Sequence, residues 1–255
     1  MSYYAYTDDS HKECFKVLAK NIITEPDRRR AYYCPCCNAI FGFRAQSSTN
    51  KPPHFYKLPS SQHNINCWMP YIEGISGEVT PEDARNFTLE GFYEGVISSK
   101  ERELHNNSSE NKGDKDKKPV SSTMHLNTIR NLYKFCILQD NNYKVVDELK
   151  VKDILVSRKT AFYYSRFAFG KRLVEAQYSG YSDKTIFLNY PFGKEQSLFT
   201  VVLNFDDEAL FRKTKNKTYG NEKPILVFSK WSYKESNGRI YVRTKIINTH
   251  QVVAL

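Results

Sequence analysis

The chain has 255 residues, of which 40% are hydrophobic and 26% are charged, and its formal net charge is +10. That length gives room for one large domain or two small ones, and the composition is ordinary for a globular protein. No apolar run is long enough to span a membrane and the first residues are polar, so we expect neither a membrane partner nor a signal peptide.

The first predicted element is a helix that begins at Ser10. Ser10 and Glu13 have the spacing of a capping box, and Phe15, Leu18 and Ile22 follow at helical intervals. This helix should end near Glu25-Pro26, because a residue that precedes proline avoids the helical region.

A cluster of cysteine and histidine residues follows between positions 34 and 67. It contains four of the six cysteines and two of the six histidines. Pairs of thiolates and imidazoles suit a tetrahedral Zn²⁺, whereas the alternative is a small core that buries reduced cysteines. The spacing favours a closed structural zinc site. The predicted ligands are Cys34, Cys37, His54 and Cys67, with Cys36 as the alternative to Cys34 and His63 as the alternative to Cys67.

The same stretch carries a family resemblance. Tyr33-Cys34-x2-Cys37, followed by His54-Phe55, resembles the N-terminal zinc-binding module of competence-protein CoiA-like proteins, which has a Cys pair and a His-Phe-x-His motif. The match covers about residues 30–67, and it departs at Lys57, where the second His should stand. We find no counterpart of the family's nuclease motif. The resemblance therefore implies a bacterial nucleic-acid setting, such as competence, mobile DNA or phage defence, and no activity.

The cysteine usage also bears on the compartment. Crowded, metal-spaced cysteines in a chain without a predicted secretory signal are typical of a reducing environment, so we expect a cytoplasmic protein.

The domain boundary is predicted from a change in amino-acid composition. Thr80-Pro81 has the pattern of a helix start, and we expect that helix to pack on the zinc module. Residues 99–123 are rich in Asn, Ser, Lys and Asp, and such a stretch cannot bury enough surface to offset its chain entropy. The sequence predicts a zinc-binding module with flanking helices over 1–98, a flexible linker or long loop over 99–123, and a basic β domain over 124–255.

The C-terminal part combines one helix with many short strands. A helix is predicted over 124–138, and a short helix over 206–213. Short apolar and aromatic runs separated by turn residues predict an antiparallel barrel that is OB-like, and hence an α+β fold class for the whole chain. The runs are 153–157, 161–169, 173–178, 185–190, 198–205, 225–233 and 239–247.

The positive charge lies in the same C-terminal part. Residues 1–98 contain 10 Lys and Arg against 11 Asp and Glu, and residues 124–255 contain 22 against 12. A basic domain joined to a nearly neutral one indicates a polyanionic partner for the basic domain. The alternative is that the lysines only keep the surface soluble.

Asn237-Gly238 predicts a β-hairpin, because Asn-Gly between two strand-like runs is a strong hairpin signal. A two-residue turn pairs Lys234 with Tyr241, Ser232 with Arg243 and Lys230 with Lys245, and it separates two faces. The predicted core face has Ile225, Val227, Trp231, Tyr233, Ile240, Val242 and Ile246. The predicted basic face has Lys230, Lys234, Arg239, Tyr241, Arg243 and Lys245.

Basic grooves with aromatic residues bind single-stranded nucleic acid, with phosphates on Lys and Arg and bases on the rings. A second basic segment is predicted as a flexible loop over the barrel mouth, and it contains Arg212, Lys213, Lys215 and Lys217. The sequence therefore favours a protein that binds single-stranded DNA or RNA.

Two other functions stay open. No phosphate-binding glycine loop or hydrolase motif is found, which favours a non-catalytic protein. A divergent metal-dependent nuclease would need an acidic group such as Asp206-Asp207-Glu208. A protein-interaction adaptor would bind a protein partner through the zinc module.

Overall fold

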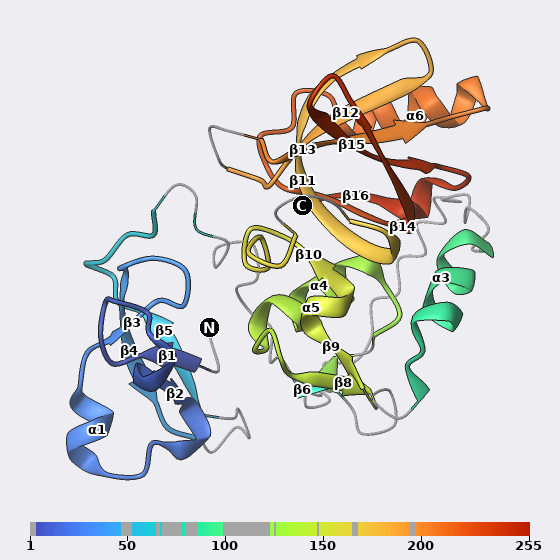
Figure 1. The fold of residues 1–255 in the computed structure, drawn as a ribbon. Coiled ribbons are helices and arrows are strands. Elements are labelled where there is room, and N and C mark those ends of the chain that lie inside the picture. The colour runs from blue at the N-terminus through green and yellow to red at the C-terminus, as the bar shows by residue number, and fades with distance from the viewer. Residues whose placement is uncertain are drawn as a thin grey trace, which may run out of the picture.

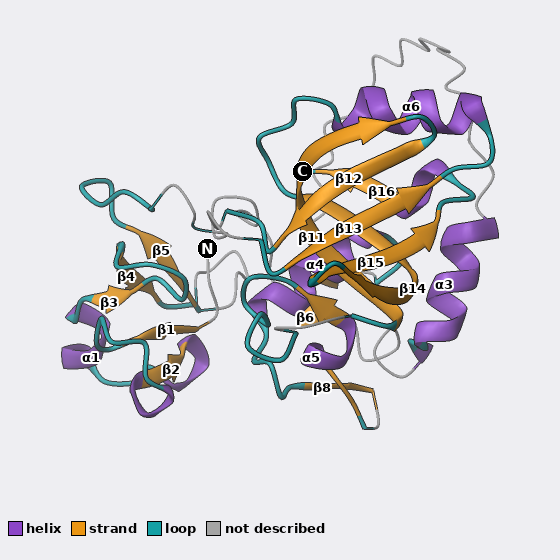
Figure 2. Ribbon diagram, turned by 45° about the horizontal axis from the view of Figure 1, so that its top comes forward, coloured by secondary structure: helices purple, strands orange, loops and turns teal. Residues whose placement is uncertain are grey.

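Two β-sheets organise the chain in the computed structural model, one in its N-terminal part and one in its C-terminal part (Figure 1, Figure 2). The structure describes residues 4–46, 53–64, 67, 78–79, 86–98, 123–124, 126–146, 148–164, 168–193 and 197–255. The helix start predicted at Thr80 and nearly all of the predicted linker lie outside these residues. The predicted mixture of helices and strands is confirmed.

The N-terminal sheet is antiparallel and has five short strands in the order β2-β1-β3-β4-β5. Its core is aromatic, since Tyr32, Phe41 and Phe55 are fully buried and the rings of Tyr32 and Phe55 are 4.7 Å apart. A sheet therefore supports this part of the chain, and not the helical module that the sequence predicted. The strands are β1 Tyr4–Tyr6, β2 Lys16–Leu18, β3 Tyr32–Tyr33, β4 Ile40–Arg44 and β5 His54–Lys57.

The helix predicted from Ser10 to Pro26 is wrong. Strand β2 lies in its place, between two single turns of 3-10 helix, because β1 takes Val17 and its neighbours as pairing partners. Phe15 and Leu18, expected on the buried side of a helix, are each 38% exposed. Helix α1 (Glu25–Arg29) begins where the predicted helix was to end, with Thr24 as its N-cap and a proline in its first turn.

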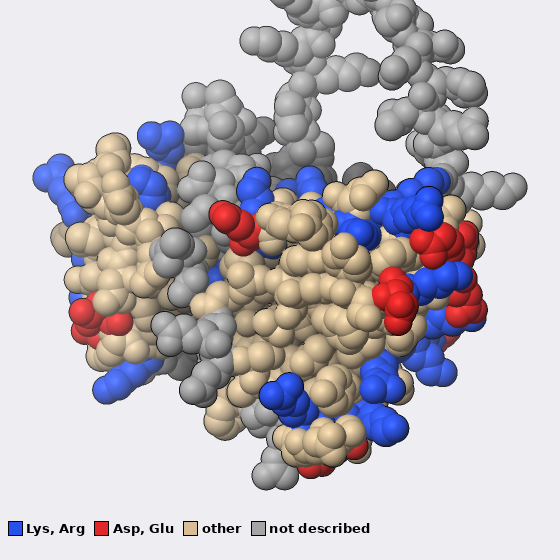
Figure 3. All heavy atoms as spheres, turned by 90° about the horizontal axis from the view of Figure 1, so that it is seen from above, with Lys and Arg blue, Asp and Glu red and all other residues tan. Residues whose placement is uncertain are grey.

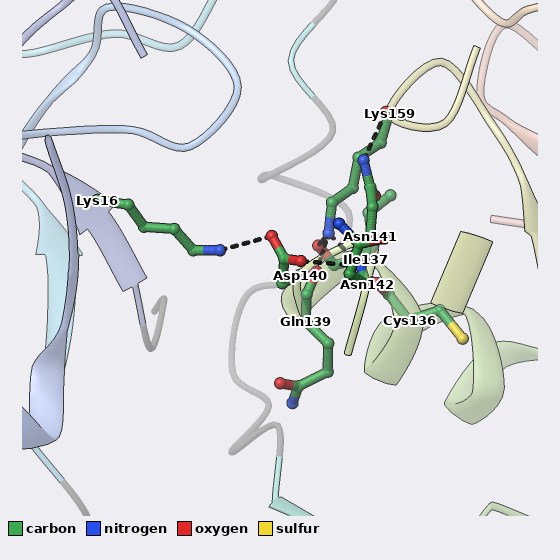
Figure 4. A network of polar contacts seen from close by, with 8 residues as sticks. All are labelled: Lys16, Cys136, Ile137, Gln139, Asp140, Asn141, Asn142 and Lys159. Atoms are coloured by element: carbon green, nitrogen blue, oxygen red, sulfur yellow. Dashed lines mark hydrogen bonds and ion pairs between the residues drawn. The ribbon is translucent and has the colours of Figure 1, made fainter. Parts of the chain in front are cut away.

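Polar contacts join the N-terminal sheet to the end of helix α4 (Ile129–Leu138), as Figure 4 shows. Lys16 of β2 forms an ion pair of 2.8 Å with Asp140, directly after the helix. The ammonium group of Lys159 donates to the last carbonyl groups of α4 and also lies 5.7 Å from the ring of Tyr4. A cation is favourable at a helix C-terminus, so Lys159 caps α4 and contacts β1 at once.

The C-terminal sheet closes into a five-stranded barrel. The strand order is β11-β12-β13-β15-β14, and β14 pairs with β11 again to complete the ring. β13 and β15 run parallel, and the other barrel pairs are antiparallel. Helix α6 (Glu208–Thr218) connects the third strand to the fourth. The barrel strands are β11 Gly170–Ser182, β12 Thr185–Tyr190, β13 Phe199–Asn204, β14 Ile225–Ser236 and β15 Arg239–Lys245.

Most of the predicted strands lie where the pattern placed them. The runs at 173–178, 185–190 and 225–233 fall within barrel strands, and the runs at 198–205 and 239–247 cover β13 and β15 with one or two residues to spare. The run at 161–169 is wrong, because its described residues form turns after the short strand β10 (Leu155–Val156). The helix predicted over 124–138 is confirmed as α4, which begins after its N-cap Thr128. There are also two small two-stranded sheets, β6 (Glu78–Val79) with β7 (Thr123–Met124) and β8 (Lys144–Val146) with β9 (Leu149–Lys150). Helix α5 (Val151–Ile154) precedes β10, and β16 (Val252–Ala254) is an edge strand beside β14.

Helix α3 (Leu89–Ser98) packs on the outside of the barrel. The ring of Phe92 meets that of Phe228 on β14 edge to face, with 4.8 Å between the ring centres. Glu90 forms an ion pair with Lys171 of β11. The expectation that the helix near residues 80–98 covers the zinc module is therefore not met by α3, which buries its apolar side on strands of the barrel.

A buried carboxylate connects helix α4 to the barrel. Glu175 of β11 is fully buried, and it accepts a hydrogen bond of 2.6 Å from the hydroxyl group of Tyr133 on α4. Arg158 forms an ion pair of 3.3 Å with the other carboxylate oxygen. Burial raises the pKa of Glu175, and the charge on Arg158 and the hydrogen bond from Tyr133 act against that rise. Arg158 and Tyr133 therefore stabilise the ionised form of the Glu175 carboxylate.

We expect Arg158→Met to destabilise the protein by about 3–5 kcal/mol, because it leaves a buried carboxylate without its charge partner. The loss should grow as the pH rises from 5 to 8. A carboxyl group whose pKa is raised in the folded state favours folding below the unfolded-state pKa and opposes it above that pKa. Chemical denaturation at both pH values measures this. Glu175→Gln in the Arg158→Met background should recover part of the loss at pH 8, and equal losses at the two pH values would contradict the assignment.

Candidate metal centre and basic sheet face

The tight turn between β3 and β4 contains three cysteines, of which Cys34 and Cys37 belong to the candidate metal cluster. Cys34 follows β3 directly, and its backbone amide donates to the carbonyl oxygen of Ala39 at 2.8 Å, which closes the turn. The amide of Cys36 points at the sulfur of Cys34, with 3.4 Å between nitrogen and sulfur. The short turn therefore brings the thiols of Cys34 and Cys37 to one side, and both residues are buried.

The segment after β5 contributes the other two donors, His63 and Cys67. The amide of Cys67 donates to the carbonyl oxygen of Asn64 at 2.9 Å, which holds these two residues together. The ring of His63 meets Phe41 edge to face at 5.7 Å between ring centres, and Phe41 is fully buried in β4. The aromatic core of the sheet thus supports the imidazole from behind.

Four ligand atoms meet at this place. The sulfur atoms of Cys34, Cys37 and Cys67 and a ring nitrogen of His63 all lie within 4.8 Å of one another. The sulfur atoms of Cys34 and Cys67 are 3.6 Å apart, and Nδ1 of His63 is 3.3 Å from the sulfur of Cys67 and 3.5 Å from that of Cys37. In a tetrahedral zinc site with Zn–S bonds of about 2.3 Å, sulfur atoms stand roughly 3.8 Å apart. The spacing and donor types fit such an ion, and four protein donors leave no open position.

The pKa values of Cys34 and Cys37 are shifted in opposite directions. A hydrogen bond from Cys34 lowers the pKa of Cys37 to about 4, with help from the backbone amides of Asn64 and Ala39 and from His63. Burial raises the pKa of Cys34, which acts as the donor of the pair. Because zinc binds thiolates, Cys37 is prepared as a ligand, whereas Cys34 must release its proton on binding.

The structure selects His63 over His54. His54 lies opposite Arg44 at the far end of the β4–β5 pair, whereas Lys57 lies opposite Phe41 near the cysteine turn. Three residues of a strand span roughly 10 Å, so the strand carries His54 away from the sulfur atoms. Cys36 is half-buried and also lies outside the four-residue cluster. The ammonium group of Lys57 donates to the carbonyl oxygens of Leu58 and Ser61.

The hairpin at the other end of the chain has two of the three predicted pairs, and the predicted pair of Lys230 with Lys245 is not part of the ladder. Lys234 lies opposite Tyr241, Ser232 opposite Arg243 and Ser236 opposite Arg239. Asn237 and Gly238 both have positive φ angles, of 52° and 69°, as a two-residue hairpin turn requires. Lys230 lies further along β14, opposite Lys171 of β11.

The two predicted faces of the hairpin separate, with one exception. Five residues of the predicted core face are buried inside the barrel, namely Ile225, Val227, Trp231, Val242 and Ile246, and Ile240 packs against them. Tyr233 is 52% exposed, so its assignment to the core is wrong. The residues of β14 from Ser232 to Glu235 are all exposed, so the buried part of this strand ends at Trp231.

The basic face is exposed to different degrees. Lys230, Lys234 and Arg239 are exposed, and Tyr241 and Arg243 are half-buried, with the guanidinium group of Arg243 5.6 Å from the ring centre of Tyr241. Lys245 forms an ion pair with Asp206. Figure 3 shows that Lys and Arg on one side of the molecule are spread around an area of uncharged residues, with Asp and Glu next to several of them. The face is therefore a mixed surface with a basic rim.

The second basic segment is a helix, and the expectation of a flexible loop is wrong. Arg212, Lys213, Lys215 and Lys217 all lie on α6. Asp207 caps this helix by accepting from the amide of Ala209, and Phe211, Thr214 and Thr218 form its buried side. The acidic residues expected for a nuclease have structural partners here. Asp207 is the cap, Glu208 pairs with Arg212 at 3.0 Å, and Asp206 pairs with Lys245.

Two rows of outward-facing residues cross the barrel beside the hairpin. Inward and outward residues alternate along β12, whose Ile186, Leu188 and Tyr190 are buried. The predicted binding face did not include β12 or β13, although this alternation in the sequence is the signal for it. Across β12, β13, β15 and β14, one row is Phe187, Val202, Arg243 and Ser232, of which Val202 is buried, and the next is Asn189, Thr200, Tyr241 and Lys234.

Comparisons with protein-family models, curated proteins and solved structures give no match for this chain. Among the described residues, no helix has both the length and the apolar character to cross a membrane. The arguments about function therefore rest on the geometry of the metal cluster and the barrel face.

We expect the full-length protein to bind one zinc ion, with loss of the metal in Cys37→Ser and in His63→Ala and retention in Cys36→Ser and in His54→Gln. Elemental analysis of the purified variants measures this. Binding should weaken as the pH falls, because protons compete for the thiolates and the imidazole. A metal-free His54→Gln variant beside a zinc-loaded His63→Ala variant would show that the ligand set is different.

Proposed function

We propose that this chain is a non-catalytic protein that binds single-stranded nucleic acid on the outer face of its barrel, beside a structural zinc site. The observation that carries the proposal is the pair of residue rows across β12, β13, β15 and β14. They combine aromatic rings at Phe187 and Tyr241, cations at Arg243 and Lys234, and amide and hydroxyl groups between them. Such a surface offers stacking partners for bases and charge partners for phosphates.

The strand topology supports an OB-like assignment of the barrel. A closed five-stranded ring, a parallel pair between its third and fifth strands and a helix between its third and fourth strands agree with that fold. OB-folds bind oligonucleotides on the face of their second and third strands and through adjoining loops. Here the second and third strands are β12 and β13, and the loop between the last two contains Asn237-Gly238.

The charges of the face favour a polyanion that is held mainly through its phosphates. Lys230, Lys234 and Arg239 are exposed, and the C-terminal part carries the whole positive excess of the chain. The neutral area between the cations suits uncharged base surfaces. Single strands expose both phosphates and base faces, whereas a duplex hides the base faces in its stack. We therefore favour single strands over duplexes.

The metal cluster has a structural role in this proposal. Three sulfur donors and one nitrogen donor fill a tetrahedral zinc shell, and a closed shell holds chain segments together. Zinc would connect the β3–β4 turn to the segment after β5. By analogy with the CoiA-like module, the protein would act in the cytoplasm of a bacterium, in competence, mobile-DNA or defence processes.

We expect Lys234→Glu/Arg243→Glu to weaken the binding of a labelled single-stranded oligonucleotide on the order of tenfold or more. Fluorescence anisotropy of the full-length protein at several salt concentrations measures this. If both residues contact phosphates, the slope of log K against log salt should become less negative by about 1.4 in the double variant.

Lys20→Glu/Arg30→Glu is the matched control, because it makes the same change of charge at exposed positions of the N-terminal part. It should bind nearly as well as the wild type. Equal losses in both double variants would mean that only net charge matters, and the specific face would then be rejected. If the wild-type protein binds neither single strands nor duplexes at low salt, the nucleic-acid function itself fails, and a protein partner becomes the leading alternative.

A further inference from the structure

A β-bulge in β11 gathers two tyrosines on one side of the strand. Tyr178 lies opposite Leu188 and Tyr181 lies opposite Ile186, and the register shifts by one residue between them, at Ser179. Residues three apart on a regular strand point to opposite faces, but the extra residue in a bulge reverses that rule. Tyr178 and Tyr181 therefore share the face of their partners Leu188 and Ile186, at the open end of the barrel.

Helix α6 adds a third tyrosine to the same place. Phe211, Lys215 and Tyr219 are spaced by four residues, so they lie in one row along the helix. Phe211 is buried and its ring is 6.3 Å from that of Tyr181. Tyr219 meets Tyr178 at 5.7 Å and Tyr181 at 6.1 Å, edge to face in both pairs. We call Tyr178, Tyr181 and Tyr219 the tyrosine cluster.

The tyrosine cluster is open to solvent although it is aromatic. Tyr181 is 45% exposed and Tyr219 is 63% exposed. The ammonium group of Lys215 lies 3.6 Å from the ring centre of Tyr181, on the side of the helix. The three rings therefore support one another and the helix fixes one side of Tyr181, but none of these contacts covers the remaining ring surface of Tyr219.

The charges around the cluster favour an anionic ligand. Between Glu208 and Thr218, α6 carries four basic residues and one acidic residue, and Glu208 is paired with Arg212. Lys213 is exposed, and Lys184 lies in the turn after Tyr181 with its ammonium group donating to the carbonyl oxygen of Asp206. The acidic residues nearest in sequence are Asp183, directly after the end of β11, and Glu222, after the end of α6. A proline-rich peptide also binds to tyrosine surfaces, but it needs no such excess of cations.

We propose that the tyrosine cluster is a separate nucleobase-stacking site, which holds an unpaired base on Tyr181 or Tyr219 while Lys215, in the same row of the helix, contacts an adjoining phosphate. This inference rests on the proposed function, since it assigns a second contact of the same single strand. The site lies between α6 and the β11–β12 hairpin and shares no residue with the two rows on the outer face. Base–aromatic stacking tolerates any base, so the site would add affinity and little sequence preference.

The test compares Tyr181→Leu/Tyr219→Leu with Tyr181→Phe/Tyr219→Phe in the full-length protein. Leucine keeps apolar volume but removes the ring, whereas phenylalanine keeps the ring. The leucine variant should bind a single-stranded oligonucleotide on the order of tenfold more weakly, and the phenylalanine variant should bind like the wild type. The salt slope should be unchanged in both, because no cation is removed. Thermal unfolding of each variant reports whether the fold is kept.

A second measurement locates the contact directly. An oligonucleotide that carries 5-iodouracil crosslinks under long-wavelength light to the side chains that stack on it, and mass spectrometry of the digest identifies the peptide. We expect crosslinks to Tyr181 or Tyr219 in the wild-type protein and their loss in the leucine variant.

Four outcomes would overturn the inference, and they are distinguishable. If the folded leucine variant binds with wild-type affinity while Lys234→Glu/Arg243→Glu still weakens binding, the tyrosine site is rejected and the proposed function stays intact. Equal losses in the leucine and phenylalanine variants reject stacking. Binding of a proline-rich peptide at the cluster, with no oligonucleotide crosslink, assigns it to a different partner. The absence of any oligonucleotide binding by the wild type removes the proposed function and this site together.

Discussion

Strand β11 is the constraint on which the C-terminal architecture depends. It is 13 residues long, and it pairs with β14 along its first half and with β12 along its second half. One strand can serve two partners in this way only if it bends around the barrel, and the bulge near Ser179 increases that bend. The same strand carries Glu175 outward to helix α4, so barrel closure and helix docking are set by a single segment.

The N-terminal sheet has a different source of order. Its strands contain two to five residues, and three buried aromatic rings dominate its interior. Short strands with so little apolar surface gain few contacts from pairing alone. The cluster of Cys34, Cys37, His63 and Cys67 brings the β3–β4 turn to the segment after β5, and a metal there would add to the hydrogen bonds that Ile40 makes with Leu58 and Ser61.

The sequence patterns predicted the barrel better than the N-terminal part, for a physical reason. Every barrel strand buries at least one face, so short apolar runs and the Asn237-Gly238 turn are strong signals. Ser10, Glu13 and the apolar residues after them match a helix pattern equally well, but β1 offers Val17 a pairing partner that local propensity does not reveal. Tertiary pairing overrides a short helical pattern.

The metal ligands illustrate the same limit. Spacing in the sequence identified the cysteines and both histidines, but only the register of β4 and β5 distinguishes His54 from His63. Similarly, the acidic and basic residues after Phe205 were visible as charge, yet their arrangement as a capped helix depends on Asp207 and on the buried side of Phe211 and Thr214. Sequence gives donor types, and the fold decides which donors meet.

The closure of the barrel has a consequence for how the chain folds. The β11–β12 and β14–β15 hairpins join neighbouring segments, and short loops close rapidly. The pairing of β11 with β14 instead brings together groups such as Trp231 and Arg172, which are 59 residues apart. Long-range contacts of this kind slow folding, because the loop must be ordered before the contact forms. The two hairpins should therefore form early, and the edges of β11 and β14 stay unpaired until these strands meet. During that interval the open edges can pair with strands of other chains, so the protein is then most prone to association.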